Sequence, residues 1–341
     1  MGRHRLTPGA ERVVCLLGTS CDSFFEAATR VLPEACGLRL AEATVRSVTE
    51  DAGKRLGALH ERGHTLGDSE PFGWHPDATG RSCGYISLDA TGVPQQAKGG
   101  GPAEGRMPYV AAIYNPVPER PAEVGSDAPT AVPRPAMQAR YVAGLMGLSD
   151  LGPLLRRQAG QVGLEQAQRW IGLSDGGNGL EEFLQANFNR ADLVVILDFW
   201  HAASYLEAVA RALFPADEAK RREQTRQWCH TMKHEGGAAI LQALRDLEVA
   251  RHRKALREAR QEAAGYIENN LHRMDYPRYV SHGWQIGSGP IESACKSVVG
   301  QRLKLAGMRW REDGTDNVCH LRALFKSAAD QWDAFWERDV N

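Results

Sequence analysis

Short apolar segments that alternate with helical patterns are the feature that most constrains the fold of this 341-residue chain. The segment Asp192–Asp198 places five consecutive apolar residues between two aspartates, which favours a strand buried on both faces. Four earlier segments are also typical of strands, at residues 83–93, 109–114, 140–145 and 168–174. Helical patterns follow Ser149 and cover residues 180–188 and 201–214. This order predicts an α/β core around a mixed five-stranded sheet.

Helical segments surround this predicted core, which covers residues 83–215. Residues 1–65 predict a helical domain with a break at Cys36-Gly37; a DNA-binding helix-turn-helix and a small packing domain both fit this pattern. One helix is expected at about 21–32, ending at Pro33. Residues 66–82 are rich in Gly, Pro, Asp and Ser and predict a linker. The rest predicts an all-helical insertion at 216–280 and helices that complete the core at 281–341.

Two segments inside the core predict loops. Residues 95–108 are glycine-rich and are expected to form a mobile loop. Residues 115–137 hold six of the 17 prolines and are expected to form an irregular excursion. Neither segment is therefore expected to contribute a regular element.

The composition is that of an ordinary globular protein, with 43% hydrophobic and 24% charged residues. No apolar run reaches the ~18 residues of a membrane span, and the first residues lack the apolar stretch of a signal peptide. Seven cysteines without a CxxC pair do not indicate a disulfide framework. We therefore expect a cytoplasmic protein with no membrane partner.

The formal net charge of −1 argues against a uniformly basic nucleic-acid-binding protein. Charge is unevenly distributed, however, because residues 293–311 contain no acidic side chain. This segment predicts a DNA-binding surface of backbone-contacting cations and one tryptophan for stacking on an unpaired base. Its candidate residues are Lys296, Arg302, Lys304, Arg309, Trp310 and Arg311. A solvated helix face beside a core tryptophan explains the same pattern.

Three carboxylates that are distant in the sequence carry the strongest chemical signal. Asp89 lies inside the apolar segment 83–93, Asp175 follows the segment 168–174, and Glu292 begins a predicted helix. Carboxylate oxygens suit hard divalent cations, and phosphoryl transfer uses two such cations about 3.5–4 Å apart. Structural roles also fit each residue: a buried aspartate held by backbone donors, a turn residue before Gly-Gly, and a carboxylate at a helix N-terminus.

Other titratable residues are weaker candidates. Asp198 and His201 lie at a strand-to-helix junction near the predicted site, where His201 is expected to orient a phosphate or a metal-bound water. A helix cap at Asp198 explains the junction equally well. Cys229, His230 and His234 suggest a zinc site, but no fourth ligand is evident, so a core cysteine beside surface histidines is the simpler interpretation.

Several of these motifs together resemble a known family. Segment 269–310 resembles bacterial insertion-sequence transposases of the ISKra type, through Asn269-Asn270, Arg273-Met274-x-Tyr276-Pro277, Ile286-Gly-Ser-Gly-x-x-Glu292-Ser-Ala-Cys-Lys296 and Arg302-Leu-Lys304-x-x-Gly307-Met-Arg-Trp310. Similar motifs occur earlier, at Leu88-Asp89-x-Thr-Gly-Val-Pro94, Asp175-Gly and Ile196-Leu-Asp198-Phe-Trp-His201-Ala202. The resemblance covers most of residues 20–336, and the chain departs from it after Asp175, in the two predicted loops and in a short N-terminus.

This resemblance implies a DDE transposase with an RNase H-like catalytic domain. Asp89 would then bridge two Mg²⁺ or Mn²⁺ ions, with Asp175 holding one ion and Glu292 the other. The implied partners are transposon-end DNA and target DNA, with at least a homodimer in the DNA complex and a nucleoid location when bound. Two alternatives stay open: a transposase-derived DNA-binding protein without catalysis, and a structure-specific RNase H-like nuclease.

Overall fold

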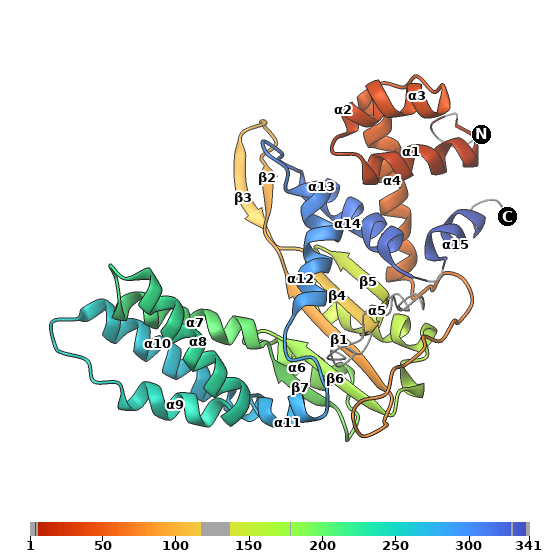
Figure 1. The fold of residues 1–341 in the computed structure, drawn as a ribbon. Helices are drawn as coiled ribbons and strands as arrows, with labels where there is room; N and C mark the ends of the chain where they lie inside the picture. Colours follow the sequence, from red (N-terminus) through yellow and green to blue (C-terminus); the bar gives the residue numbers. More distant parts are fainter. Residues whose placement is uncertain (1–3, 5, 117–136, 178, 329, 339–341) are drawn as a thin grey trace, which may run out of the picture.

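The computed structural model describes residues 4, 6–116, 137–177, 179–328 and 330–338. Its centre is a five-stranded mixed sheet with the strand order β5-β4-β1-β6-β7 (Figure 1). The strands are β1 (Cys83–Ala90), β4 (Tyr109–Asn115), β5 (Gln138–Gly144), β6 (Arg169–Ser174) and β7 (Val194–Leu197). β4 runs antiparallel to β1 and β5, whereas β6 and β7 run parallel to β1. The predicted mixed five-stranded sheet is confirmed.

Alternating side chains of the strands form two cores, because successive residues of a strand point to opposite faces. On one face, Ile86 and Leu88 of β1 belong to a cluster with α5 (Leu148–Gln161) and α6 (Leu180–Asn187). On the other face, Tyr85 belongs to a larger cluster with α7 (Phe199–Leu213), α12 (Gly289–Ala294) and α14 (Glu312–Lys326). The second face is the one to which Asp89 also points, since it lies four residues after Tyr85.

A π-helical turn follows the helix that carries Glu292. α12 continues into a π-helix at Cys295–Gly300 and then into α13 (Gln301–Leu303). A π-helix interrupts the regular hydrogen-bond pattern and leaves backbone carbonyls in need of other donors. Arg322 of α14 supplies them: its guanidinium donates to the carbonyls of Ser297 and Val298, and also to that of Thr19.

The N-terminal helices are α1 (Pro8–Ser20), α2 (Phe24–Glu26), a π-helix at Ala27–Val31, α3 (Leu32–Cys36) and α4 (Glu42–Glu61). The predicted helix end at Pro33 is wrong, because the chain stays helical from Phe24 to Cys36. The wider π-helical turn directly before Pro33 accommodates a residue that has no N–H to donate. The helix ends instead at Gly37, whose φ of 65° gives a left-handed cap.

The N-terminal and C-terminal helices share one core. α4 packs against α14, and α14 packs against β5. Close approach depends on a glycine in α4, because a Cβ at Gly53 would lie 2.1 Å from the carbonyl oxygen of Asn317. Phe335 and Trp336 of α15 (Gln331–Arg338) are buried in the same cluster, and Trp332 packs on it.

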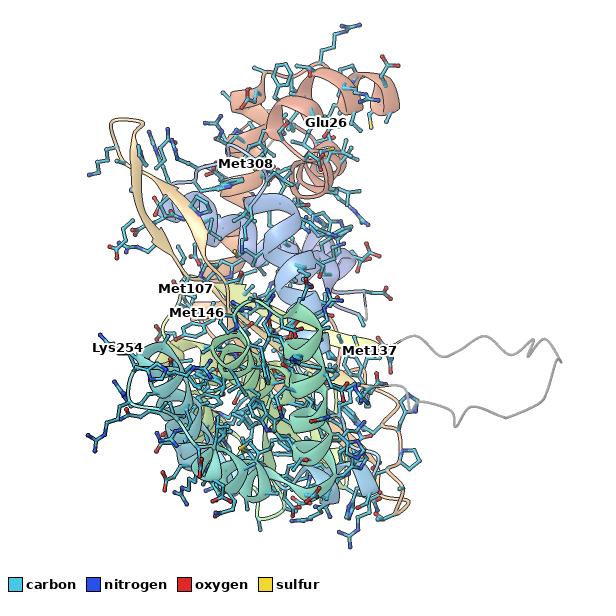
Figure 2. All side chains as sticks on the ribbon, turned by 60° about the vertical axis from the view of Figure 1, so that its left-hand side comes forward. Glu26, Met107, Met137, Met146, Lys254 and Met308 are labelled. Atoms are coloured by element: carbon cyan, nitrogen blue, oxygen red, sulfur yellow. The ribbon has the colours of Figure 1, made fainter. Side chains whose placement is uncertain are left out.

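Four helices lie between α7 and α12 and form a bundle beside the sheet (Figure 1). They are α8 (Glu218–Glu235), α9 (Gly237–Asp246), α10 (Lys254–Asn270) and α11 (Tyr276–Ser281). α8 and α10 pack against α7, so α7 starts at the sheet and continues into the bundle. Lys254 lies at the outer edge of this bundle (Figure 2). No helix in the described part of the chain is long and apolar enough to cross a membrane.

Residues 95–108 form a hairpin and not the predicted loop. β2 (Val93–Gln96) pairs with β3 (Pro102–Arg106), and Met107 lies at the base of the hairpin (Figure 2). The N–H of Gln96 donates to the carbonyl of Trp310 at 2.7 Å, and the N–H of Trp310 donates to the carbonyl of Pro94 at 3.1 Å. A partner more than 200 residues away thus orders a glycine-rich segment. The other predicted loop lies mostly outside the described residues.

We predict that Gly53→Ala destabilises the protein, because the new methyl group collides with backbone of α14 that cannot rotate away. The expected loss is ~1–3 kcal/mol in the free energy of unfolding, measured by urea denaturation. Gly265→Ala in α10 is the matched control, since a Cβ there meets no atom within 4 Å. It should raise stability by ~0.5–1 kcal/mol through helix propensity. Equal stability of Gly53→Ala and the wild-type protein would contradict the tight α4–α14 contact.

Candidate active site

The pairing of two neighbouring parallel strands aligns Asp89 with Asp175. β1 pairs with β6 in a register that places Ser87 beside Leu173. Asp89 lies two residues further along β1, and Asp175 directly follows the last residue of β6. Neighbouring strands lie about 4.8 Å apart, and the charge of Asp175 raises the pKa of Asp89. Two carboxylates from distant parts of the sequence therefore lie side by side at the carboxyl edge of the sheet.

Glu292 approaches this pair from the helix that covers the same face. Ile291 and Ala294 of α12 are buried in the core cluster against the sheet, and Glu292 between them is exposed. The hydroxyl of Ser288 donates to Oε1 of Glu292 at 2.7 Å. Because α12 contacts β1 and β4, its exposed carboxylate lies near the end of β1.

Electrostatics show that the three carboxylates interact. Burial raises the pKa of Asp89 above its ordinary value, and repulsion from Asp175 and Glu292 raises it further. Two hydrogen bonds oppose this shift: Oδ1 accepts from the N–H of Ala90 at 2.7 Å, and Oδ2 accepts from Sγ of Cys295 at 3.7 Å. The site thus concentrates negative charge around Asp89.

The helical bundle supports the turn that carries Asp175. Oδ1 of Asp175 accepts the N–H of Gly177 at 2.8 Å, and the hydroxyl of Tyr266 accepts the N–H of Gly176 at 3.0 Å. The guanidinium of Arg273 donates to the carbonyl of Asp175 at 3.4 Å. A Cβ at Gly176 would lie 2.5 Å from the ring of Tyr266, so glycine is required for this contact.

Arg273 is buried and connects the turn to the rest of the fold. It forms an ion pair with Glu181 of α6 at 3.1 Å and donates to the side chain of Asn270. Arg273 belongs to one of the sequence motifs, which indicates no role for it, and Tyr266 lies outside all of them. No local signal reveals Tyr266, because its contact with Gly176 spans 90 residues.

Asp198 has a structural role in this arrangement. Its buried carboxylate caps α7 by accepting the N–H groups of Trp200 and His201, and it also accepts the N–H of Ser288 at 2.9 Å. The cap interpretation is confirmed. His201 lies beside the rings of Tyr205 and Tyr266, with centroid distances of 5.8 and 5.6 Å. The carboxylate therefore links the start of α7 to the segment that leads into α12.

Two members of the predicted DNA-binding surface are buried, which corrects that prediction. Arg302 is 1% exposed and lies over the rings of Phe24 and Trp310, at 4.3 and 4.9 Å from their centroids. Its Nε donates to the carbonyl of Gly18 at 2.9 Å. Trp310 is 8% exposed and packs edge-on against Phe24. Neither side chain is available for a phosphate or an unpaired base, because both hold the N-terminal helices to the core.

The other four members are exposed: Lys296, Lys304, Arg309 and Arg311. Nζ of Lys304 donates to the hydroxyl of Thr91 at 3.0 Å. Thr91 lies two residues after Asp89 in the sequence. Lys296 forms no ion pair with Glu292 or any other carboxylate in the described part of the chain. Of these four cations, Lys304 is therefore the one that a contact places near Asp89.

The donor set is suited to hard divalent cations, because all three candidate ligands offer carboxylate oxygens. Oδ2 of Asp175 and Oε2 of Glu292 accept no hydrogen bond from a described residue, so each residue has an oxygen to offer. The side chains do not, however, converge into a group of three or more His, Cys, Asp or Glu ligands within the described ranges. The same finding leaves the zinc site at Cys229, His230 and His234 without support.

No family model and no curated protein matches this chain. The comparisons therefore neither support nor oppose the resemblance to insertion-sequence transposases. The assignment of the site depends on its geometry and charge alone.

We predict that Asp89→Asn raises the melting temperature of the metal-free protein. The pKa of Asp89 is raised in the folded state, so its ionised form costs stability at pH 7 and the protonated form does not. The neutral amide removes this cost and should add on the order of 2 °C. The difference should shrink as the pH falls through the raised pKa. Thermal unfolding between pH 4 and 8 tests this, and a variant that melts below the wild-type protein at pH 7 would contradict it.

We also predict that Tyr266→Phe weakens Mn²⁺ binding by roughly tenfold, because the turn of Asp175 loses its acceptor for Gly176. Isothermal titration calorimetry measures this affinity. Tyr205→Phe is the matched control, since Tyr205 stacks on Tyr266 at 4.1 Å and its hydroxyl makes no hydrogen bond to a described residue. Equal affinities in the two variants would show that Tyr266 does not position Asp175.

Proposed function

We propose that this protein is a DDE transposase, which uses divalent cations to cut the ends of a mobile DNA element and to join them to target DNA. One observation carries the proposal: Asp89 lies near the end of β1, Asp175 directly follows the neighbouring parallel strand β6, and Glu292 lies on the helix that packs against β1. Three carboxylates from separate parts of the chain support a metal-dependent phosphoryl-transfer site.

We further propose that the α/β core is RNase H-like. The sheet begins with three consecutive antiparallel strands, and two parallel strands follow, each preceded by a helix. This is the element order that the resemblance implies. The helical bundle separates α7 from α12 in the sequence, but α12 still packs against β1 and β4 of the sheet.

Two Mg²⁺ or Mn²⁺ ions would be held by Asp89 together with Asp175 on one side and Glu292 on the other. When bound, such ions lower the pKa of the attacking water and neutralise charge on the leaving oxygen. The residues around the site also favour the binding of these ions. Burial and the mutual repulsion of the carboxylates favour binding of positive charge, and Ser288, Tyr266 and Arg273 restrict the movement of the ligands.

The reaction consists of two phosphoryl transfers. In the first, the oxygen of water forms a bond to phosphorus while the bond from phosphorus to the 3′ oxygen breaks; water loses a proton and the 3′ oxygen gains one. In the second, this 3′-OH attacks a phosphodiester of the target, whose own 3′ oxygen leaves and is protonated. No bond to the protein is formed, so no nucleophilic side chain is required.

The exposed cations next to the site are suited to hold the DNA backbone. Lys304 lies closest to the carboxylates through its contact with Thr91, and Lys296, Arg309 and Arg311 extend the surface along the same C-terminal segment. Joining requires two DNA ends at one place, so we propose that at least two copies of the chain act together on DNA.

The test is a Mn²⁺-dependent cleavage and joining assay on labelled DNA that carries the sequences flanking the native gene. Asp89→Asn and Glu292→Gln should each reduce product at least 100-fold while DNA binding is retained, because they remove a metal ligand. Glu235→Gln, at the exposed end of α8, is the matched control and should act like the wild-type protein.

The products separate the alternatives. Joined products that disappear in both carboxylate variants support a transposase. Cleaved ends without joining would identify a structure-specific nuclease that uses the same carboxylates. DNA binding without any product, from a wild-type protein that binds Mn²⁺, would identify a transposase-derived binding protein.

A further inference from the structure

Trp200 is the most exposed large hydrophobic side chain in the described ranges, with 63% of its surface accessible. It is the second residue of α7, two residues after the cap Asp198. Its indole lies against the backbone of Gly287, where a Cβ would come within 2.8 Å of Cδ1. One edge of the ring is therefore held in place while much of its surface is open to solvent.

Trp200 forms one side of a cavity of about 680 Å³, a size typical of small-ligand sites. Trp284 also lines this cavity, and its orientation is restricted: Nε1 donates to Asp77 at 3.0 Å, and the guanidinium of Arg169 lies 5.1 Å from its ring. Tyr85 of β1 is a further lining residue, whose hydroxyl accepts the N–H of Gln285. Tyr85 and Trp284 are 2% and 4% exposed, so Trp200 supplies the open aromatic surface of the cavity.

A free cation completes the cavity. Lys233 projects from α8 into its lining, is exposed, and pairs with no carboxylate of a described residue. An exposed indole and a cation in the lining of one cavity match the chemistry of a nucleotide, because the base stacks on the ring and the phosphate attracts the ammonium group.

The cavity is joined to the carboxylates by short, hydrogen-bonded connections. The N–H of Phe199 donates to the carbonyl of Ile286 at 2.8 Å, and Ser288 is bonded both to Asp198 and to Glu292. On β1, the cavity residue Tyr85 and Asp89 point to the same face, about 13 Å apart along the strand. A DNA strand whose phosphate lies at the carboxylates can therefore extend into the cavity.

We propose that this cavity receives an unpaired base of the DNA strand held at the Asp89–Glu292 site, stacked against Trp200 with its phosphate next to Lys233. The inference rests on the proposed function and adds to it a distinct subsite for a base outside the duplex. It also replaces Trp310, which the sequence suggested for stacking and which is buried. A free nucleotide has the same chemistry, so the experiment must separate the two sources.

The test places 2-aminopurine at successive positions around the cleaved bond of flanking-sequence DNA and follows its fluorescence with Glu292→Gln protein in Mn²⁺. Stacking on the indole should quench the signal several-fold at one unpaired position. Trp200→Ala should abolish the quenching and weaken binding roughly 5- to 100-fold. Trp200→Phe, which keeps an aromatic ring, should retain most of the affinity.

Phe25→Ala is the matched control, because Phe25 is 61% exposed on the N-terminal helices and does not line the cavity. It should behave like the parent protein, and all variants should melt within about 2 °C of it, as expected for exposed side chains. Free deoxynucleoside monophosphate, added in competition, should not displace the DNA.

Three results would overturn the inference. Equal quenching in Trp200→Ala and its parent, with cleavage by the otherwise wild-type protein intact, would overturn this subsite alone. Displacement by the free nucleotide at concentrations that leave cleavage intact would assign the cavity to a soluble ligand. Absence of DNA binding and cleavage by the wild-type protein would overturn the proposed function and this inference with it.

Discussion

The parallel pairing of β1 with β6 is the constraint on which the candidate site depends. β1 pairs antiparallel with β4 on one side and parallel with β6 on the other, so the sheet changes direction at this strand. A shift of one residue in this register would turn Asp89 to the opposite face, away from Asp175. The buried side chains Ile86 and Leu88 oppose such a shift, because it would move them out of their core cluster.

Two buried arginines extend this constraint to the ends of the chain. Arg322 supplies donors to the π-helical turn after α12, and Arg302 lies between aromatic rings of the N-terminal helices and of Trp310. Burial lowers the pKa of both to about 10, so both remain charged at pH 7 and need partners in the interior. Carbonyls and aromatic faces fill that need. The helix of Glu292 is thereby held to the N-terminal helices as well as to the sheet.

The helical bundle has a role beyond separating β7 from α12 in the sequence. Tyr266 and Arg273 reach from it to the backbone at Gly176 and Asp175, and Lys233 lines the cavity under Trp200. Tyr266 and Arg273 form hydrogen bonds with backbone groups of the turn, and Lys233 adds a cation to the cavity. The bundle therefore supports the candidate site from the side opposite to the N-terminal helices.

Local patterns in the chain predicted the strands of the sheet and the positions of the carboxylates relative to them. Apolar runs of strand length are local signals, so the strands containing Asp89 and preceding Asp175 were predictable to within about three residues. The cap at Asp198 was likewise a local pattern, since its donors are two and three residues away. These features depend on residues that are close in the sequence, so the spacing of apolar and polar residues along the chain predicts them.

The accessibility of the polar and aromatic side chains depends instead on contacts between distant parts of the chain. Arg302 and Trp310 belong to a basic segment that is typical of an exposed surface, but the N-terminal helices, almost 300 residues earlier in the chain, cover them. Trp200, within an apolar segment typical of a core, is exposed. The glycine-rich hairpin is ordered by backbone pairing with Trp310. Burial and pairing are set by distant partners, and no local pattern contains that information.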